Sequence, residues 1–184
     1  MISTKLVNKE IKIIIDKNSY LQILKTEDVS ETYVDWLNDY EVTKFTEQKN
    51  SIHSIESVKE YVNQKYNSKY DYLFGIYCDS EHIGNIKLGP IKWQHKISEI
   101  SFFIGNKKFW GQGIATKAVT KLVEYAINNL DLKKIEAGFY DLNIGSTKVF
   151  KKCGFIVEGI KVSSAIFEDK RIDSIIVGYR SKKI

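Results

Sequence analysis

The chain has 184 residues, of which 43% are hydrophobic and 28% are charged, and this length and balance are typical of one globular domain with a sizeable core. The formal net charge is +5, yet Arg171 and Arg180 are the only arginines. Because arginine is the usual reader of guanine edges and a strong phosphate clamp, this composition disfavours a sequence-specific nucleic-acid binder. We therefore expect no nucleic-acid partner.

The cysteines and the hydropathy pattern disfavour further classes of protein. Cys78 and Cys153 lack the paired spacing of a zinc site or a disulfide framework, so we expect no metal and a reduced, cytoplasmic protein. No apolar run approaches the roughly 20 residues of a membrane-spanning helix, and we expect no membrane partner. The sequence has no repeat and no linker, and Pro90 is its only proline. Residues 1–184 are therefore expected to form a single domain.

The first part of the chain predicts two short strands followed by helices. Ile11 to Ile15 and Tyr20 to Leu24 are β-prone runs, which form either a hairpin or an extended lead-in to one strand. Thr26 is a suitable N-cap for a first helix, and a helical turn follows between Val42 and Phe45. Ser54 is suited to cap the next helix, whose apolar residues recur on one side.

The middle of the chain predicts a sheet. Strand-like runs span Tyr72 to Cys78, His82 to Leu88 and Ile97 to Ile104, and turn residues favour a hairpin between the first two. Lys133 to Tyr140 predicts a further strand. Because a helix separates this strand from Ile97 to Ile104, we expect the two to be parallel neighbours in a right-handed β-α-β unit.

The helix of that unit follows a glycine-rich turn. From Ile114 to Leu130 the apolar residues recur at the spacing of an amphipathic helix. Gly111 and Gly113 precede it. They either make a tight connection only, or let the backbone approach an anion at the helix start, where free N–H groups attract phosphate.

The last part of the chain predicts a short helix that starts at Asn143 or Ser146 and ends at Cys153. Two closing strands, Phe155 to Val162 and Asp173 to Tyr179, follow it. The predicted fold is α/β (α+β), with helices around a mixed, mostly antiparallel sheet that has one parallel pair at its centre.

Two motifs stand out, W-G-Q-G-I-A-T at Trp110 to Thr116 and N-I-G-S-T-K-V-F-K-K-C-G-F at Asn143 to Phe155, with the expected strand between them. Together they resemble the motifs of the GNAT superfamily of N-acetyltransferases. The resemblance runs from about Tyr20 almost to the C-terminus, and is strongest to the branch of ribosomal-protein N-terminal acetyltransferases and amino-sugar nucleotide acetyltransferases. It implies a GNAT-like fold whose central parallel strands splay apart, with acetyl-CoA as cosubstrate.

The resemblance also implies which residues bind that cosubstrate. Backbone N–H groups from Gln112 to Thr116 would bind the pyrophosphate, although Trp110 replaces the family's first Gln or Arg. The Ile104 amide would polarise the thioester carbonyl. Asn143 and Ser146 would contact the cosubstrate, although both are also ordinary N-cap residues. The implied residues are Phe102, Phe103, Ile104, Gln112, Gly113, Ile114, Ala115, Thr116, Asn143 and Ser146.

Acetyl transfer to an amine needs a base, because a free aliphatic amine has a pKa of about 10 and is protonated at neutral pH. By resemblance the base is Glu99, and the equally weighted alternative is that Glu99 is only a solvent-facing residue of its strand. His95 is a second candidate for the base. The family's usual acid, a tyrosine, is replaced by Phe150. Either the thiolate leaves unassisted, or Tyr140 donates the proton, or catalysis is lost.

Acceptor selection in the family depends on the loop after the first helices and on the last hairpin. The candidate substrate-binding residues are Asp39, Tyr40, Phe45 and Trp93. We expect an N-acetyltransferase that acts by direct attack of a small amine, such as an amino sugar on a nucleotide, without a covalent enzyme intermediate. The alternatives are a protein N-terminal or polyamine acetyltransferase and a non-catalytic acyl-CoA-binding sensor. A homodimer is expected by analogy alone.

Overall fold

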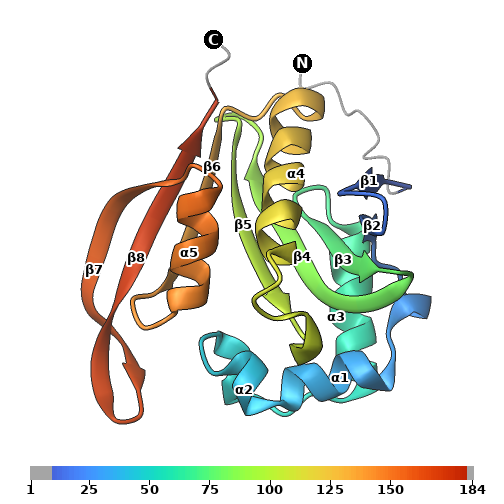
Figure 1. The fold of residues 1–184 in the computed structure, drawn as a ribbon, viewed down its shortest axis with the longest axis horizontal. Helices are drawn as coiled ribbons and strands as arrows, with labels where there is room; N and C mark the ends of the chain where they lie inside the picture. Colours follow the sequence, from blue (N-terminus) through green and yellow to red (C-terminus); the bar gives the residue numbers. More distant parts are fainter. Residues whose placement is uncertain (1–9, 182–184) are drawn as a thin grey trace.

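An eight-stranded β-sheet runs through the computed structural model, which describes residues 10–181, and helices lie on both faces of the sheet (Figure 1). The strand order is β1-β2-β3-β4-β5-β6-β8-β7. The strands are β1 (Lys12–Ile14), β2 (Ser19–Ile23), β3 (Tyr72–Cys78), β4 (Glu81–Lys92), β5 (Ile97–Ile104), β6 (Lys134–Tyr140), β7 (Ile156–Phe167) and β8 (Lys170–Arg180). The helices are α1 (Glu31–Asn38), α2 (Tyr40–Thr43), α3 (Ile55–Asn67), α4 (Ile114–Asn129) and α5 (Ile144–Lys152), with 3-10 turns η1 (Thr26–Asp28), η2 (Glu47–Asn50) and η3 (Lys107–Phe109).

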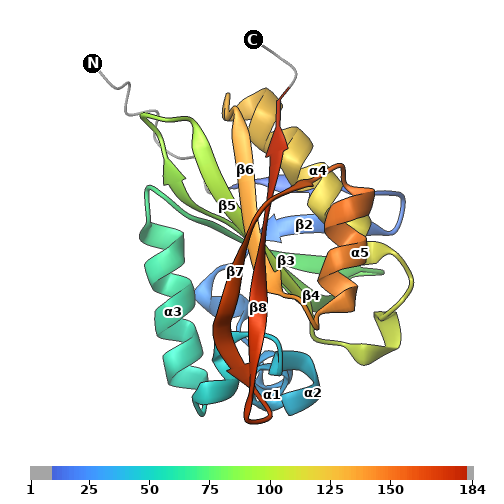
Figure 2. The same cartoon turned by 90° about the vertical axis from the view of Figure 1, so that its left-hand side faces the viewer.

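The two faces of the sheet carry separate cores. Helices α4 and α5 cover one face, and α3 lies on the other with α1 at its lower end (Figure 2). The apolar stripe of α4 faces the larger core, which confirms the predicted amphipathic helix. Its buried residues are Ile114, Ala118, Val119, Leu122, Val123 and Ala126. No helix within residues 10–181 is long and apolar enough to cross a membrane.

Strands β5 and β6 form the single parallel pair of this sheet, and α4 connects them as predicted. Their pairing covers only three positions, from Ile97 opposite Lys134 to Glu99 opposite Glu136. Beyond these positions β5 stays paired with β4 and β6 stays paired with β8, so the two strands diverge. The predicted mixed sheet with a splayed central pair is therefore confirmed.

Three local predictions are decided by the structure. The first two strands form a hairpin, with Lys12 opposite Gln22. The predicted cap at Thr26 is wrong, because the chain makes a 3-10 turn there and α1 starts only after Ser30, whose hydroxyl accepts the Tyr33 N–H at 3.2 Å. Ser54 caps α3 as predicted, by accepting the Ser57 N–H at 3.2 Å.

The closing hairpin is longer than predicted. Strand β7 continues past Val162 to Phe167, and a register shift between Lys161 and Ala165 absorbs the irregular stretch. The tip of the hairpin reaches the segment after α2, where Phe167 stacks on Phe45 with 5.2 Å between the ring centroids. The hairpin and the α2 region thus meet beside the open end of the β5–β6 gap (Figure 1).

Candidate active site

The gap between β5 and β6 exposes backbone groups of β5. Gly105 donates its N–H to the Ile83 carbonyl at 2.9 Å, so this pair is a hydrogen-bonded one in the antiparallel ladder with β4. Such pairs alternate with non-hydrogen-bonded ones, and Ile104 opposite Gly84 is one of the latter. The N–H groups of Ile104 and Phe102 therefore point toward β6, where the strand pairing has already ended.

An aromatic cluster fills the α5 side of this gap. Phe150 of α5 is 3% exposed and lies 5.6 Å from Phe102 of β5 and 5.5 Å from Phe139 of β6, measured between ring centroids. Phe155 adds an edge-to-face contact at 5.0 Å. The side chain at the family's acid position is thus a core residue that holds the two diverging strands apart.

The glycine turn before α4 has the backbone that only glycine adopts readily. Gly111 and Gly113 have φ angles of 75° and 78°, and no other group lies within 4 Å of where a Cβ would stand. Gly113 is the N-cap of α4, and no side chain caps this helix. The first bond within the helix runs from the Lys117 N–H to the Gly113 carbonyl at 3.1 Å, which leaves the N–H groups of residues 114–116 pointing out of the helix start.

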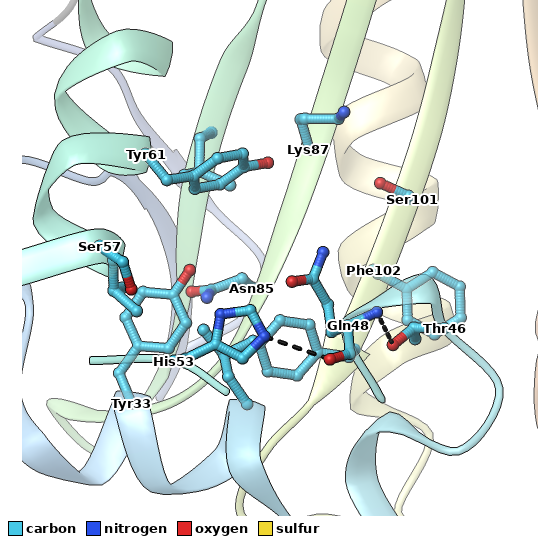
Figure 3. A pocket seen from close by; sticks show the side chains of 14 residues that line it. Tyr33, Thr46, Gln48, His53, Ser57, Tyr61, Asn85, Lys87, Ser101 and Phe102 are labelled. Atoms are coloured by element: carbon cyan, nitrogen blue, oxygen red, sulfur yellow. Dashed lines mark hydrogen bonds between the residues drawn. The ribbon is translucent and has the colours of Figure 1, made fainter. Parts of the chain in front are cut away.

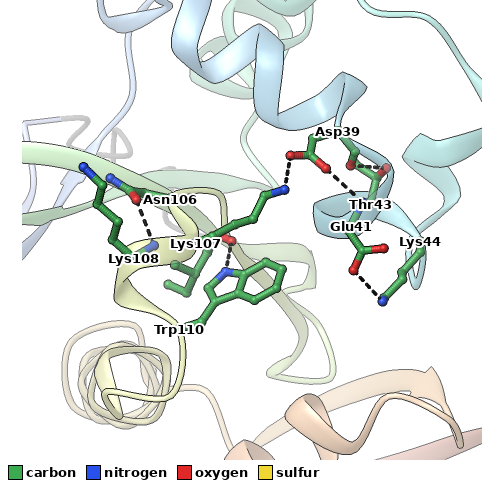
Figure 4. Close-up of polar contacts among 9 residues, drawn as sticks. Asp39, Glu41, Thr43, Lys44, Asn106, Lys107, Lys108 and Trp110 are labelled. Atoms are coloured by element: carbon green, nitrogen blue, oxygen red, sulfur yellow. Dashed lines mark hydrogen bonds and ion pairs between the residues drawn. The ribbon is translucent and has the colours of Figure 1, made fainter.

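Trp110 ties this turn to the end of β5. Its indole Nε1 donates to the Ile104 carbonyl at 2.8 Å (Figure 4). Gln112 donates its side-chain amide to the Lys108 carbonyl at 2.7 Å, inside the same turn. Trp110, which departs from the family motif, therefore fixes the end of β5 next to the start of α4. The N–H donors of the strand end and of the helix start are thus held close together.

Two lysines near the turn are engaged in exposed ion pairs. Lys107 contacts Asp39 at 2.6 Å (Figure 4), and Lys117 contacts Asp16 at 2.8 Å. The hydrogen bond from Lys117 lowers the pKa of Asp16 to about 2, and that from Lys107 lowers the pKa of Asp39. Lys108 makes no ion pair within the described part of the chain. The partial positive charge of the helix start is thus accompanied by one unpaired lysine.

The second predicted motif starts α5. Asn143 is the N-cap, and its Oδ1 accepts the Ser146 N–H at 3.0 Å. The Thr147 hydroxyl donates to the Asn143 carbonyl at 3.1 Å. Asn143 therefore has the capping role that sequence alone allows, whereas Ser146 supplies the N–H that is capped. The contact of both residues with a cosubstrate remains a prediction.

A cavity of about 260 Å³ lies on the opposite face of β5 (Figure 3). Its floor is the middle of the sheet, where Leu73, Lys87 and Ser101 lie in one row, and Asn85 and Phe103 pair in the next. Its walls come from α1, η2 and its flanking residues, and α3. These wall residues are Tyr33, Leu37, Thr46, Gln48, His53, Ser57, Val58 and Tyr61.

The cavity carries polar groups that the sheet buries. Asn85 is 3% exposed, and its Oδ1 accepts from His82 Nε2 at 2.8 Å. Its Nδ2 faces the Tyr33 hydroxyl (Figure 3) without the geometry of a hydrogen bond, and has no partner among residues 10–181. Burial raises the pKa of Tyr33 and lowers the pKa of His82, so both stay uncharged at neutral pH.

Tyr140 lies at the open end of β6 and connects it to η2. Its hydroxyl donates a short hydrogen bond to Glu47 Oε1, and Lys49 Nζ lies 5.9 Å from its ring centroid. Burial, followed by the bond to Glu47, raises the pKa of Tyr140 to about 12. Because Thr46 and Gln48 flank Glu47 and line the cavity, Tyr140 braces the wall of the cavity from β6.

Glu99 is exposed and lies in the last position where β5 and β6 pair. It alternates with Ser101 along β5 and therefore points to the cavity face of the sheet, where its charge acts on Lys87. It does not line the cavity itself. The carboxylate of its neighbour Glu136 is engaged, because it contacts Lys134 at 2.7 Å. The carboxylate of Glu99 has no ion-pair partner among the described residues.

The predicted substrate-binding residues do not line the cavity. Asp39 caps α2 and pairs with Lys107, and Tyr40 beside it is 51% exposed. Phe45 stacks on the closing hairpin. Trp93 lies in the turn between β4 and β5, where its indole donates to the Lys69 carbonyl at 3.0 Å, at the end of β5 remote from the gap.

Sequence reasoning missed the polar floor of the cavity, Asn85 and Lys87. A signal for both exists in the run from Ile83 to Leu88, because Asn85 and Lys87 alternate there with apolar residues. A central strand with helices on both faces is normally apolar throughout, so alternating polar residues indicate a cavity on one face. Among residues 10–181, no three His, Cys, Asp or Glu side chains are grouped so as to hold a metal ion.

Comparison with known families identifies the class of this protein. The family model described as acetyltransferase (GNAT) domain matches residues 20–156. The chain therefore belongs to the GNAT acetyltransferase family. It is 35% identical over 113 residues to the probable N-acetyltransferase YjcK of Bacillus subtilis, an alignment that covers 58% of this chain and 62% of that relative. The chain thus spans about three fifths of that relative's length.

Solved structures share the fold. The ribosomal alpha-N-protein acetyltransferase RimL in complex with coenzyme A superposes with a TM-score of 0.84 over 92% of this chain and 98% of that one, at 16% identity. The spermidine N-acetyltransferase from Vibrio cholerae in complex with CoA and spermine gives a TM-score of 0.81 over 91% and 98%, at 19% identity. At such identities the likeness shows a common fold.

Proposed function

We propose that this protein is an N-acetyltransferase that moves an acetyl group from acetyl-CoA to a primary amine in a ternary complex. The observation that carries the proposal is the arrangement at the open end of β5. The Ile104 N–H points into the β5–β6 gap, the uncapped start of α4 lies beside it, and a cavity opens on the other face. Family membership and the coenzyme A named in both solved structures support acetyl-CoA as cosubstrate.

The groups available at this end of β5 fit such a cosubstrate. The N–H groups from Gln112 to Thr116 would hold its pyrophosphate, since a helix start without a capping side chain is an anion site. The outward N–H groups of Phe102 and Ile104 would hold its extended arm, with Asn143 and Ser146 across the gap. Bound acetyl-CoA supplies the acetyl group as a thioester, and we assign the Ile104 N–H as the donor to its carbonyl oxygen.

Direct attack by the amine is favoured over a covalent enzyme intermediate. Burial raises the pKa of Cys153, whose thiol lies against Thr120 in the α4–α5 core. Cys78 lies on β3 beside Ser19, and neither cysteine lines the cavity. A nucleophilic cysteine needs a lowered pKa and access to substrate, and Cys153 has neither.

We propose that Glu99 accepts the proton of the attacking amine through water. Its carboxylate points to the cavity face but stands outside the cavity lining, so a water-filled path is required. Lys87 on the neighbouring strand keeps positive charge near this carboxylate.

The departing thiolate needs no proton from Tyr140 in this proposal. A thiol has a pKa of about 8.5, so its anion is a fair leaving group. Tyr140 has a pKa of about 12, and its proton is already donated to Glu47. Proton transfer from that hydroxyl to a thiolate would be uphill. We therefore assign Tyr140 to positioning of the η2 wall, and favour unassisted departure of the thiolate.

The finer calls on partners are proposals of their own. We propose a small amine, such as an amino sugar on a nucleotide, as the acceptor, with the amine-bearing part of the acceptor in the cavity of about 260 Å³. We also propose a homodimer through the edge strand β7, where several apolar side chains are exposed. These are Ile156, Val157, Ile160, Val162 and Ile166. Sedimentation of the purified chain at a monomer mass would contradict the dimer.

The function is tested by two measurements on the wild-type protein. Acetyl-CoA at ~100 times its Kd is expected to stabilise the fold by about 2.7 kcal/mol, measured as a thermal shift. Release of free thiol from acetyl-CoA is then measured over a panel of amino sugars, polyamines and N-terminal peptides. A thermal shift without thiol release on any acceptor would favour a cofactor sensor, and no shift would overturn both proposals.

A further inference from the structure

The charges of the cavity differ from those that a polyamine site requires. Of its lining residues, Lys87 alone carries a fixed charge, and no aspartate or glutamate lines the cavity. Asp71 and Glu99, the carboxylates whose charge acts on Lys87, both lie outside the lining. Asp71 accepts from the Ser68 hydroxyl at 2.8 Å and contacts Lys65 at 3.4 Å, and Glu47 binds Tyr140. A polycationic acceptor would thus meet a positive group in the lining, with no carboxylate in the lining itself to balance it.

Lys87 is a half-buried ammonium without a fixed partner. It lies on the floor of the cavity, opposite Ser101 and beside Tyr61 (Figure 3). Its Nζ makes no hydrogen bond or ion pair with residues 10–181. Burial lowers its pKa, and the charge of nearby Lys65 adds to this effect, while Asp71 and Glu99 oppose it. A buried ammonium is normally paired, so the missing partner is a place for an anion.

Asn85 adds a second unused donor on the same strand. It stands two residues before Lys87, so both side chains point to the same face of the sheet. Its Oδ1 is taken by His82, and its Nδ2 faces the Tyr33 hydroxyl at the cavity wall but has no hydrogen-bond partner among residues 10–181. A buried amide N–H without an acceptor is unfavourable by itself, and an oxygen of a bound molecule would satisfy it.

We infer that the cavity selects an amine that also carries an anionic group, a carboxylate or a phosphate, which Lys87 and Asn85 bind. This inference rests on the proposed function, because it assumes that the cavity is the acceptor site. Lys87 would contact the anion, and Asn85 Nδ2 would donate to one of its oxygens or to a neighbouring carbonyl or hydroxyl. Polyamines, which lack such a group, are then poor acceptors.

Matched acceptor pairs test the inference by binding, independently of turnover. The carboxylate arm compares an amino acid with its amide, and the phosphate arm compares glucosamine 1-phosphate with glucosamine. Spermidine is the polycationic probe. Each is titrated by calorimetry into protein saturated with coenzyme A. We expect at least one anionic member to bind roughly 10- to 100-fold more tightly than its neutral partner, and spermidine to bind most weakly.

Two variants connect that preference to the named residues. Lys87→Met keeps the length of the side chain and removes its charge, and Asn85→Asp keeps the acceptor for His82 while removing the Nδ2 donor. Lys92→Met, an exposed lysine on the same strand, is the matched control. We expect Lys87→Met and Asn85→Asp to lose the preference for the anion, and the control to keep it. An unchanged thermal shift with acetyl-CoA verifies that each variant is folded.

The outcomes separate this inference from the proposed function. Equal binding within both pairs, no binding of either anionic probe, preference for spermidine, or an undiminished preference in Lys87→Met would each overturn the inference. Preference for the anion without thiol release on any acceptor would overturn the enzyme assignment and leave the inference standing. Thiol release without any preference for the anionic probes would overturn the inference and leave the enzyme assignment standing. The two arms decide between carboxylate and phosphate.

Discussion

The two sides of β5 are built in different ways. On the α4 side, the groups that would hold acetyl-CoA are backbone N–H groups, at Ile104 and at the start of α4 after Gly113. On the α3 side, the cavity is lined by side chains from three strands, two helices and a loop. The first side therefore depends on chain direction and glycine conformation, and the second on the identity of particular residues such as Lys87. Substitutions on the α3 side that leave the α4 side unchanged would therefore change the acceptor without changing the cosubstrate.

The largest effect on stability is expected at Phe150, the core residue that spaces β5 from β6 on the α4 side. Phe150→Ala removes a buried ring that spaces β5 from β6, so we expect a loss of about 3 to 5 kcal/mol in the free energy of unfolding, measured by denaturant titration. Acetyl-CoA binding should weaken with it. Tyr40→Ala, at a half-exposed aromatic, is the control and should change stability little. A loss below about 1 kcal/mol in Phe150→Ala would contradict the spacing role.

The proposed base should affect turnover without affecting the fold. Glu99→Gln is expected to lower kcat about 100-fold or more on a true acceptor, with stability unchanged within about 0.5 kcal/mol because the side chain is exposed. Glu136→Gln makes the same substitution at the paired position of β6 and should retain turnover. Full activity of Glu99→Gln between about pH 6 and about pH 9 would show that another group takes the proton.

A smaller effect is expected at the glycine turn. Gly113→Ala places a Cβ in open space, so the left-handed backbone at φ 78° is the sole source of strain, and it should lower stability by about 1 to 2 kcal/mol. Because the same backbone aims the N–H groups of the helix start, the Kd for acetyl-CoA should rise in parallel. Gly159→Ala, at a glycine with open space and no positive φ, is the control. Unchanged acetyl-CoA affinity in Gly113→Ala would contradict the anion-site role.

The smallest effect, with the opposite sign, is expected in the cavity. Lys87→Met replaces a half-buried, unpaired ammonium, so stability should stay unchanged or rise by about 1 kcal/mol. Since burial lowers the pKa of Lys87, the unfolded chain binds this proton more tightly, and wild-type stability should rise with pH as the ordinary lysine pKa of about 10.4 is approached. Denaturant titrations at several pH values should find that Lys87→Met lacks this rise. A strongly destabilised variant would contradict the idea of an unpaired charge.

The contrast between the two sides explains what sequence alone could predict. The strand from Ile97 to Ile104 and the helix from Ile114 follow from local hydrophobic periodicity, and the parallel pair follows from the helix between its strands. The glycine turn has two explanations in the sequence, and its positive φ angles with an uncapped helix start are the basis of the proposed anion site. Features made by the backbone are thus encoded in short stretches.

The cavity could not be predicted in the same way, because its lining residues come from six elements that meet only in the folded chain. Trp93 and Asp39 lie in loops of suitable chemistry, yet Trp93 lies at the far end of β5 and Asp39 is paired with Lys107. The predicted start of the first helix is wrong because Thr26 and Ser30 are both good caps, and tertiary packing decides between them.

The most direct test compares the acetyl-CoA thermal shift of three proteins in one experiment. At ~100 times the wild-type Kd, we predict stabilisation of about 2.7 kcal/mol for wild type and for Lys87→Met, and a clearly smaller value for Gly113→Ala. This result would mean that the backbone side alone binds the cosubstrate. Absence of a shift in wild type, or loss of the shift in Lys87→Met but not in Gly113→Ala, would contradict the division of the site into these two sides.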